Sequence, residues 1–327
     1  MSSTLEKQTV RITKAVRDTI KGPASSDPVA KQYIPQDAEL HVLPIERRDP
    51  IGDDVHTPVK GIVHRYPDRV LFKVVNVCAV YCRYCFRKEM IGPGTKSLSQ
   101  DEIDGALAYI RSHKDIWEVI LTGGDPLILS PRQLSAIIDN LCAIEHVQII
   151  RIHTRVPIAD PEKITDELCK TLKRDKAVYV ALHINHAQEI TDDVKRALAY
   201  LHKAGCVLLS QSVLLKGVND DAGTLEDLFR QLTALRVKPY YLHHPDLAPG
   251  TSHFRGSIKK GQRIMKELLG RLSGIAQPTY MLDIPDGYGK VPLTPSYVEE
   301  IDDDKIDGGE FMVEDYQGCK HHYPPKD

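Results

Sequence analysis

Six short apolar runs, rich in β-branched residues, alternate with six segments of helical spacing along the middle of the chain. The runs lie at 70–77, 117–123, 147–154, 177–184, 206–215 and 238–244, and the helical segments at 98–113, 130–144, 160–174, 191–205, 221–236 and 257–274. Such alternation is typical of a parallel sheet with right-handed crossovers, and continuous apolar runs indicate strands that are buried on both faces. We therefore predict an α/β fold, specifically a partial (β/α)6 barrel.

Polar residues stand at the carboxyl ends of the predicted strands and in the loops that follow them. They are Asn76, Gly123 to Asp125, His153, His183, Gln211, His243 and Asp246. Barrels of this kind carry their chemistry at that edge of the sheet. We therefore expect these side chains to surround the active site.

The two flanks of the predicted barrel differ from its middle. Residues 1–60 are polar and weakly periodic, and we expect a helical and irregular N-terminal extension there, followed by the barrel over 61–275. Residues 276–327 are rich in Pro and Gly at first and acidic later. They predict a loop across the barrel mouth and then a tail with one β-hairpin around Gly308 and Gly309 and a frayed end.

Charge and hydropathy exclude several classes of protein. A formal net charge of −2 over 327 residues argues against nucleic-acid binding and favours a small or zwitterionic ligand. No apolar run approaches the roughly 20 residues of a membrane span, and the polar N-terminus lacks the apolar stretch of a secretory signal. Seven cysteines, an odd number, fit free thiols in a reducing compartment. We expect a cytoplasmic protein with no membrane partner.

Three of the cysteines, Cys78, Cys82 and Cys85, follow the first predicted strand with the spacing C-x3-C-x2-C. Three thiolates on one short loop suit three corners of a [4Fe–4S] cluster and leave its fourth iron open to another ligand. A structural zinc site would need a fourth ligand, commonly from a second C-x2-C or H-x3-H pair, and the other cysteines offer none. A zinc loop and three unrelated thiols are the alternatives.

The sequence TGGDP, residues 122–126, ends the second predicted strand. Together with the cysteine loop it resembles the radical S-adenosylmethionine (SAM) superfamily, in which a glycine-rich segment meets the amino group of SAM. The resemblance implies a barrel of the radical SAM type and SAM as the missing partner of the cluster. The SAM contacts that it implies are Gly123, Gly124, Asp125, Tyr84 and His183.

A second pattern is shared by four segments: HRYPDRVLFKVVNVCAVYCRYCFRK, SQSVLLKGVND, KPYYLHHPDLAPGTSHFR and YMLDIPDGYGKVPLTPSYV. Together they resemble the lysine 2,3-aminomutases, from about residue 40 to about residue 300. The resemblance implies an isomerase that uses a [4Fe–4S] cluster, SAM and pyridoxal 5′-phosphate (PLP) to convert L-lysine to L-β-lysine. It also implies a small-molecule amino-acid substrate and a low-potential reductant such as flavodoxin or ferredoxin.

Lys290 lies in the Gly-bracketed sequence DGYGKVP. By the resemblance it is the lysine that tethers PLP, and the flanking glycines give its backbone room to move. A solvated surface lysine is the ordinary alternative. The other PLP contacts that the resemblance implies are Arg65, Tyr66, Arg69 and Gln211. Arginine suits the phosphate through paired donors, and a salt-bridged edge with Asp68 is the alternative for the two arginines.

Three charged residues match the family positions that hold the substrate. Arg87, two residues after Cys85, matches the arginine that binds the substrate carboxylate. Asp246 and Asp283, on different loops, match the pair that holds the distal ammonium of lysine, and such a pair favours a cationic side chain. Taken singly, each aspartate is also explained as a loop cap.

The chain also departs from the family pattern. His243 stands where a tyrosine usually lies near PLP, and the tail carries only Cys319, so we expect a homo-oligomer without the family's intersubunit zinc site. Within the family, the alternatives are the same amino shift on arginine, on ornithine or on a lysyl residue of elongation factor P. Outside it, the alternatives are a non-catalytic iron–sulfur redox protein and an ordinary PLP enzyme with a structural metal.

Overall fold

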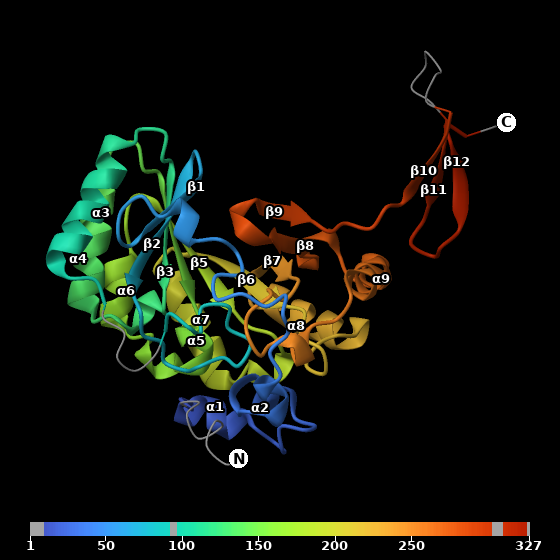
Figure 1. Ribbon diagram of the computed structural model, residues 1–327, viewed down its shortest axis with the longest axis horizontal. Coiled ribbons are helices and arrows are strands. Elements are labelled where there is room, and N and C mark those ends of the chain that lie inside the picture. Colours follow the sequence, from blue (N-terminus) through green and yellow to red (C-terminus); the bar gives the residue numbers. More distant parts are fainter. Residues whose placement is uncertain (1–9, 92–96, 303–309, 326–327) are drawn as a thin grey trace.

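A computed structural model describes residues 10–91, 97–302 and 310–325. At its centre a nine-stranded sheet, in the order β1 to β9, curls into an open barrel (Figure 1). The six predicted strands are β2 Arg69–Val75, β3 Glu118–Gly123, β4 Ile149–Thr154, β5 Ala177–His183, β6 Val207–Val213 and β7 Lys238–His243. Each pairs in parallel with the next, which confirms the partial barrel.

The edges of this sheet differ from the prediction. Strand β8, Thr279–Ile284, pairs in parallel with β7, and β9, Gly289–Pro292, returns antiparallel to β8. The prediction of a loop after residue 275 was therefore wrong, because the Pro and Gly residues mark only the turn between two strands. At the other edge, β1, Ile62–Tyr66, lies antiparallel to β2, so Arg65 and Tyr66 are strand residues.

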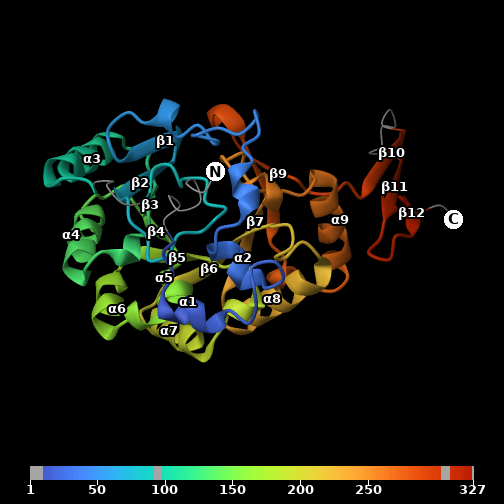
Figure 2. The ribbon, with the colours of Figure 1, turned by 60° about the horizontal axis from the view of Figure 1, so that its bottom comes forward.

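The predicted helices cover the outside of the barrel (Figures 1 and 2). They are α3 Gln100–Ser112, α4 Pro131–Cys142, α6 Asp166–Leu172, α7 Asp192–Lys203, α8 Ala222–Ala234 and α9 Ile258–Leu269, with a short α5, Val156–Ala159, after β4. The side chains of Ser99, Ser130, Thr165, Thr191, Asp221 and Ser257 accept a backbone N–H at the starts of the six longer helices. The Ser, Thr and Asp signals in the sequence thus mark helix starts, except that the segment predicted from Asp160 becomes an α-helix only after Thr165.

Short 3-10 turns occupy several connections. They are η2 Asp37–Leu40, η3 Asp54–His56, η4 Pro126–Ile128, η5 Pro161–Lys163, η6 Ala187–Glu189, η7 Ser252–Phe254, η8 Gly274–Ala276 and η9 Pro285–Gly287. The core lies between strands and helices, where Leu121, Ile152 and Val180 of the sheet and Ile138 and Leu201 of the helices are fully buried. Each such side chain contributes about 1.5–3 kcal/mol by leaving water, so this layer holds the strand ends in register.

The N-terminal helices contact the barrel, whereas the C-terminal strands lie apart from it. Helices α1, Lys14–Thr19, and α2, Pro28–Tyr33, pack against the barrel, whereas the tail forms a separate sheet that projects from it (Figures 1 and 2). Strand β10, Val298–Asp302, pairs with β11, Glu310–Glu314, as the expected hairpin, although Gly308 and Gly309 lie outside the described residues. Before residue 325 the expected frayed end is replaced by β12, Lys320–Tyr323, which adds a third strand.

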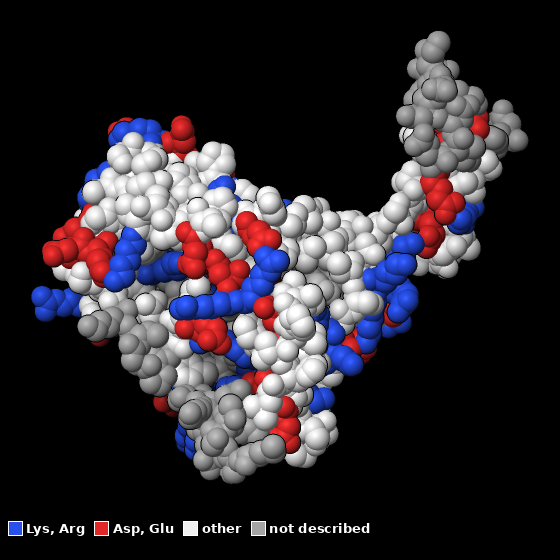
Figure 3. Space-filling model, in the orientation of Figure 1, with Lys and Arg blue, Asp and Glu red and all other residues white. Residues whose placement is uncertain are grey.

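No helix in the described part of the chain is long and apolar enough to cross a membrane. On the face that Figure 3 shows, acidic and basic side chains are interleaved around the central hollow and along the left edge, and much of the remaining barrel surface is uncharged. That face carries no single-sign surface of the kind that binds nucleic acid.

Candidate active site

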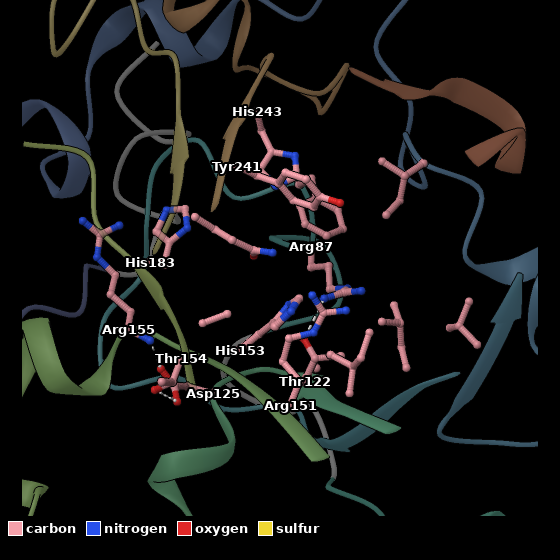
Figure 4. A pocket seen from close by; sticks show the side chains of 18 of the residues that line it. Arg87, Thr122, Asp125, Arg151, His153, Thr154, Arg155, His183, Tyr241 and His243 are labelled. Atoms are coloured by element: carbon pink, nitrogen blue, oxygen red, sulfur yellow. Dashed lines mark hydrogen bonds between the residues drawn. The ribbon is translucent and has the colours of Figure 1, made fainter. Parts of the chain in front are cut away.

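A cavity of about 720 Å³ opens at the carboxyl ends of the parallel strands and extends into the barrel (Figure 4). Asn76, which was also expected around the site, is not among the residues that line it. Every residue expected to hold the cluster, SAM, PLP or the substrate does line it. They are Cys78, Cys82, Cys85, Lys290, Arg65, Arg69, Tyr66, Gln211, Gly123, Gly124, Asp125, Tyr84, His183, Arg87, Asp246 and Asp283. The fold therefore brings together residues as far apart in the chain as Arg65 and Lys290.

The two glycines at the end of β3 allow close contact with the start of the cysteine loop. The backbone N–H of Gly124 donates to the carbonyl of Val75 at 2.5 Å, and that of Asp125 to the carbonyl of Val77 at 2.9 Å. A Cβ atom on Gly124 would lie 2.3 Å from the Val77 carbonyl oxygen, and Gly123 has a φ of +110°. Only glycine fits this approach, which fixes the residue just before Cys78.

Asp125 joins this corner to the next strand. Its buried carboxylate accepts from the Thr154 hydroxyl and the Arg155 backbone N–H, both at 2.6 Å, and from the N–H groups of Leu127 and Val156, both at 3.1 Å. Burial nevertheless raises the pKa of Asp125. The carboxylate thus fixes the β4–α5 turn (Figure 4), and its contact with SAM stays a prediction.

Tyr84 and His183, two residues predicted to contact SAM, meet on one side of the cavity. The Tyr84 hydroxyl lies 2.7 Å from Nε2 of His183, and the two rings stack with centroids 5.6 Å apart. Burial lowers the pKa of His183 far below its ordinary value, so its ring is neutral. Arg155, which the sequence reading missed, donates both to Tyr84 and, at 3.2 Å, to Sγ of Cys82.

Lys290 points into the cavity from β9. It faces Asp283 across the β8–β9 hairpin, and its ammonium forms an ion pair with one Asp283 oxygen. The other oxygen of Asp283 lies 3.4 Å from Nδ1 of His243, and the Tyr66 hydroxyl accepts the Lys290 backbone N–H at 2.8 Å. Lys290 is therefore a partnered lysine of the cavity wall and not a solvated surface residue.

The two predicted aspartates form an interacting acid pair, with Asp283 on β8 rather than on a loop. Burial, together with the negative charge of Asp283, raises the pKa of Asp246 to about 7. Asp283 differs: burial favours its protonated form, but the hydrogen bond from His243 and the charge of Lys290 hold its pKa below the ordinary value. Near neutral pH the pair carries one fixed negative charge and one that titrates.

The three predicted arginines, Arg65, Arg69 and Arg87, each form an ion pair with an aspartate. The Asp68 salt bridge foreseen as an alternative forms with Arg69, at 2.6 Å, and the guanidinium of Arg69 also lies 3.9 Å above the Tyr66 ring. Arg65 and Arg87 instead share the buried Asp53, which the sequence reading missed. Gln211 lines the cavity from β6.

Several buried donors in the cavity wall have no partner among the described residues. They are Nε of Arg65, Arg87, Arg151 and Arg155. Nε2 of His153, which donates or accepts according to the tautomer, is also buried without a partner among the described residues. Unpaired buried donors are costly, and donors that converge on one cavity suit anionic groups of a ligand. Arg151 pairs with Glu118 at 3.0 Å. The sequence analysis did not select it, because it lies within strand β4 rather than at its carboxyl end.

Known proteins share sequence with this chain over most of its length. Residues 72–229 match the radical SAM superfamily, and residues 265–325 match the C-terminal family called lysine-2,3-aminomutase. The chain is 42% identical to the L-lysine 2,3-aminomutase of Methanococcus maripaludis, over 91% of this chain and 67% of that protein. It is 42% identical to that of Clostridium subterminale, over 86% and 68%, and 41% identical to the glutamate 2,3-aminomutase of Clostridioides difficile, over 83% and 64%.

Proposed function

The chain belongs to the lysine 2,3-aminomutase family of radical SAM enzymes, and from this premise we propose that it moves the α-amino group of free L-lysine to C3. The product is L-β-lysine. The family implies a [4Fe–4S] cluster and SAM, and we propose PLP as the third cofactor. The observation that carries the proposal is one cavity lined by three cysteines, a lysine, an arginine and a pair of aspartates.

The residues of the cavity fit these groups. The unpaired Nε atoms of Arg65 and Arg87 are buried donors that an anion would satisfy. Arg65, Arg69 and Gln211 would hold the PLP phosphate, and Lys290 would hold its aldehyde. Cys78, Cys82 and Cys85 would hold the cluster, beside Tyr84 and His183 for SAM. When bound, cluster and SAM supply a carbon-centred radical, and PLP supplies a π system that shares the unpaired electron.

The charged residues fix the two ends of the substrate. The Arg87 guanidinium would bind the α-carboxylate, while Asp246 and Asp283 would accept hydrogen bonds from the distal ammonium. Asp283 is neutralised by Lys290 in the present structure. Lys290 would leave this ion pair to reach the cofactor, and the distal ammonium of the substrate would take its place beside the two carboxylates. Such a site attracts a cation and repels a carboxylate, which favours lysine over glutamate despite the glutamate-using relative.

The other residues position the reaction and exclude water. The stacked pair of Tyr84 and His183 forms one wall, and the buried network around Arg155 keeps that wall next to Cys82. A C3 atom fixed between two charged ends can meet the radical source in one orientation only, which is the main contribution a protein makes to such chemistry. We also propose that a low-potential flavodoxin or ferredoxin supplies the electron and that the protein acts as a homo-oligomer.

The test is an anaerobic assay of the reconstituted protein with SAM, PLP, a strong reductant and ¹³C-lysine, followed by NMR. We expect label in β-lysine, and no product from Lys290→Ala although its cluster absorbance is unchanged. Lys259→Ala, at an exposed position of α9, is the matched control and should retain activity. If the protein rearranges arginine, ornithine or a lysyl residue of elongation factor P in preference to free lysine, the proposed substrate is wrong. If Lys290→Ala remains active, the proposed PLP site is wrong.

A further inference from the structure

Asp53 is the shared partner of two arginines that come from different elements. Its Oδ1 lies 3.3 Å from Nη2 of Arg65, on β1, and its Oδ2 lies 2.9 Å from Nη2 of Arg87, in the loop after Cys85. The Asp53 side chain is 1% exposed. A second contact of each arginine, to the carbonyl of Ile51 at 2.7 Å and to the hydroxyl of Thr122 at 3.2 Å, completes the arrangement.

The segment that carries Asp53 is fixed to the loop before Lys290. Gly52 packs so tightly on η9 that a Cβ atom there would lie 2.3 Å from the Gly287 backbone nitrogen. Nε2 of His56 lies 3.0 Å from the Gly287 carbonyl oxygen, and Arg47 forms an ion pair with Asp286. Residues 47–57 therefore connect three parts of the cavity wall: the loop before Lys290, strand β1 and the loop after Cys85.

Asp53 interacts with more than one cation. Its carboxylate pairs with Arg65 and Arg87, and it also interacts with the charge of Lys73, on which Asp49 and Asp54 act as well. Burial alone would raise the pKa of Asp53, but the charges of Arg87, Lys73 and Arg65 hold it below its ordinary value, so the carboxylate stays ionised at neutral pH. The Nε atoms of both arginines remain unpaired among the described residues, as donors for further anions.

We propose that Asp53 is a positioning residue that fixes the Arg87 guanidinium, and through it the α-carboxylate end of the substrate, relative to Arg65 and the phosphate end of the cofactor. The inference rests on the proposed function, since it assigns those two anions to the two arginines. The inference predicts whether anion binding becomes stronger or weaker when the Asp53 carboxylate is removed. If Asp53 acted only through its charge, its removal would strengthen anion binding, whereas the loss of a positioning contact weakens it.

The experiment titrates the PLP-loaded protein with amines, without SAM or turnover. The absorbance of the bound cofactor changes when an added amine takes the place of Lys290. L-lysine and 1,5-diaminopentane are compared, because the diamine is lysine without its carboxylate. Asp53→Asn, Asp53→Glu and the wild type are tested, with Asp54→Asn as the matched control because Asp54 is exposed and adjacent.

We expect Asp53→Asn to weaken lysine binding about tenfold or more, as the loss of one member of a buried charge pair does, and to leave diamine binding unchanged. Asp53→Glu should restore part of the lysine affinity, and Asp54→Asn should match the wild type. Equal weakening for both amines would indicate general damage, and tighter or unchanged lysine binding would indicate no positioning; either overturns the inference. A wild type that responds to neither amine would instead refute the proposed function itself.

Discussion

The acid pair of Asp246 and Asp283 is the residue-scale feature through which we propose that substrate binding depends on pH. Because burial and Asp283 raise the pKa of Asp246 to about 7, Asp246 is protonated below that pH and ionised above it. Its folded-state pKa exceeds the ordinary 3.8. Its proton therefore contributes stability that is fully present below about pH 4 and is lost as the pH rises through about 7. Ligand binding has the opposite dependence, since only the ionised form attracts an ammonium.

We predict that Asp246→Asn removes this pH dependence. The asparagine mimics the protonated acid, so the ratio of the variant's KM for lysine to the wild-type KM should be near one at pH 6. At pH 8 it should rise about tenfold or more, the usual loss for a hydrogen bond to a charged group. Steady-state assays across this range measure the ratio, in which the titration of lysine itself cancels. A ratio that stays flat from pH 6 to pH 8 would contradict the assignment.

At this scale the sequence predicted which residues meet, but not what each one contacts. Lys290 and Asp283 were given separate roles, yet they form an ion pair, because the β8–β9 hairpin that places them opposite each other was not foreseen. Asp53 gave no signal, since an acidic residue in an irregular stretch is ordinarily solvated. Arg155 directly follows a predicted strand. The expectation that polar residues at the carboxyl ends of strands surround the site, which identified His183, could therefore have identified Arg155 too.

At the scale of elements, the prediction succeeded where a residue pattern repeats. The six parallel strands and their helices were found because buried strands and amphipathic helices have distinct periods. Strand β8 was missed although TYMLDI has the length and apolar content of a strand, because Pro285 and Gly287 directly follow it. Turn residues bound strands as well as interrupt them, and the composition of residues 276–292 alone does not distinguish the two cases.

The contact between the end of β3 and the cysteine loop provides a prediction at the same scale. A Cβ at position 124 would lie 2.3 Å from the oxygen and 2.6 Å from the nitrogen of Val77, both backbone atoms. We therefore expect Gly124→Ala to displace the loop that begins at Cys78, to lower the iron bound per chain after reconstitution, and to cost about 1–3 kcal/mol in the free energy of unfolding.

Gly105 offers the control for this substitution. It lies on the exposed side of α3, and a Cβ atom at this position would have nothing within 4 Å among the described residues. Gly105→Ala should therefore raise helix stability by about 1 kcal/mol and leave iron content unchanged. Denaturant titration and iron analysis of both variants make the comparison. Full iron content in Gly124→Ala would show that the cysteine loop tolerates the displacement.

At the scale of the whole molecule, the N-terminal residues 10–40 support the cysteine loop although they do not line the cavity. The backbone N–H of Tyr81 donates to the carbonyl of Arg11 at 3.0 Å, and that of Arg83 to the carbonyl of Gln32 at 2.8 Å. Arg83, between the second and third cysteines, also pairs with the fully buried carboxylate of Glu39. Three contacts from separate points of the N-terminal segment thus hold the loop that is proposed to bind the cluster.

The Glu39–Arg83 pair makes this arrangement testable. Nε of Arg83 lies 3.0 and 3.1 Å from the two Glu39 oxygens, and Nη2 lies 2.5 Å from one of them. Glu39→Ala removes the carboxylate that the buried Arg83 guanidinium contacts, and breaking such a buried pair typically costs about 3–5 kcal/mol. We expect a loss of that size in the free energy of unfolding, together with lower iron content, and little change in Asp37→Ala, whose side chain is exposed on the same turn.

The double variant Glu39→Leu, Arg83→Met separates the cost of an unpaired charge from the value of the pair itself. Replacing both members of a buried pair with apolar residues of similar volume is often nearly neutral, so the double variant should be more stable than Glu39→Ala. If the pair also orients the loop, iron content should stay low in the double variant even where stability recovers. Recovery of both quantities would show that the contact only avoids a buried charge, and that the two backbone hydrogen bonds are sufficient to hold the cysteine loop in place.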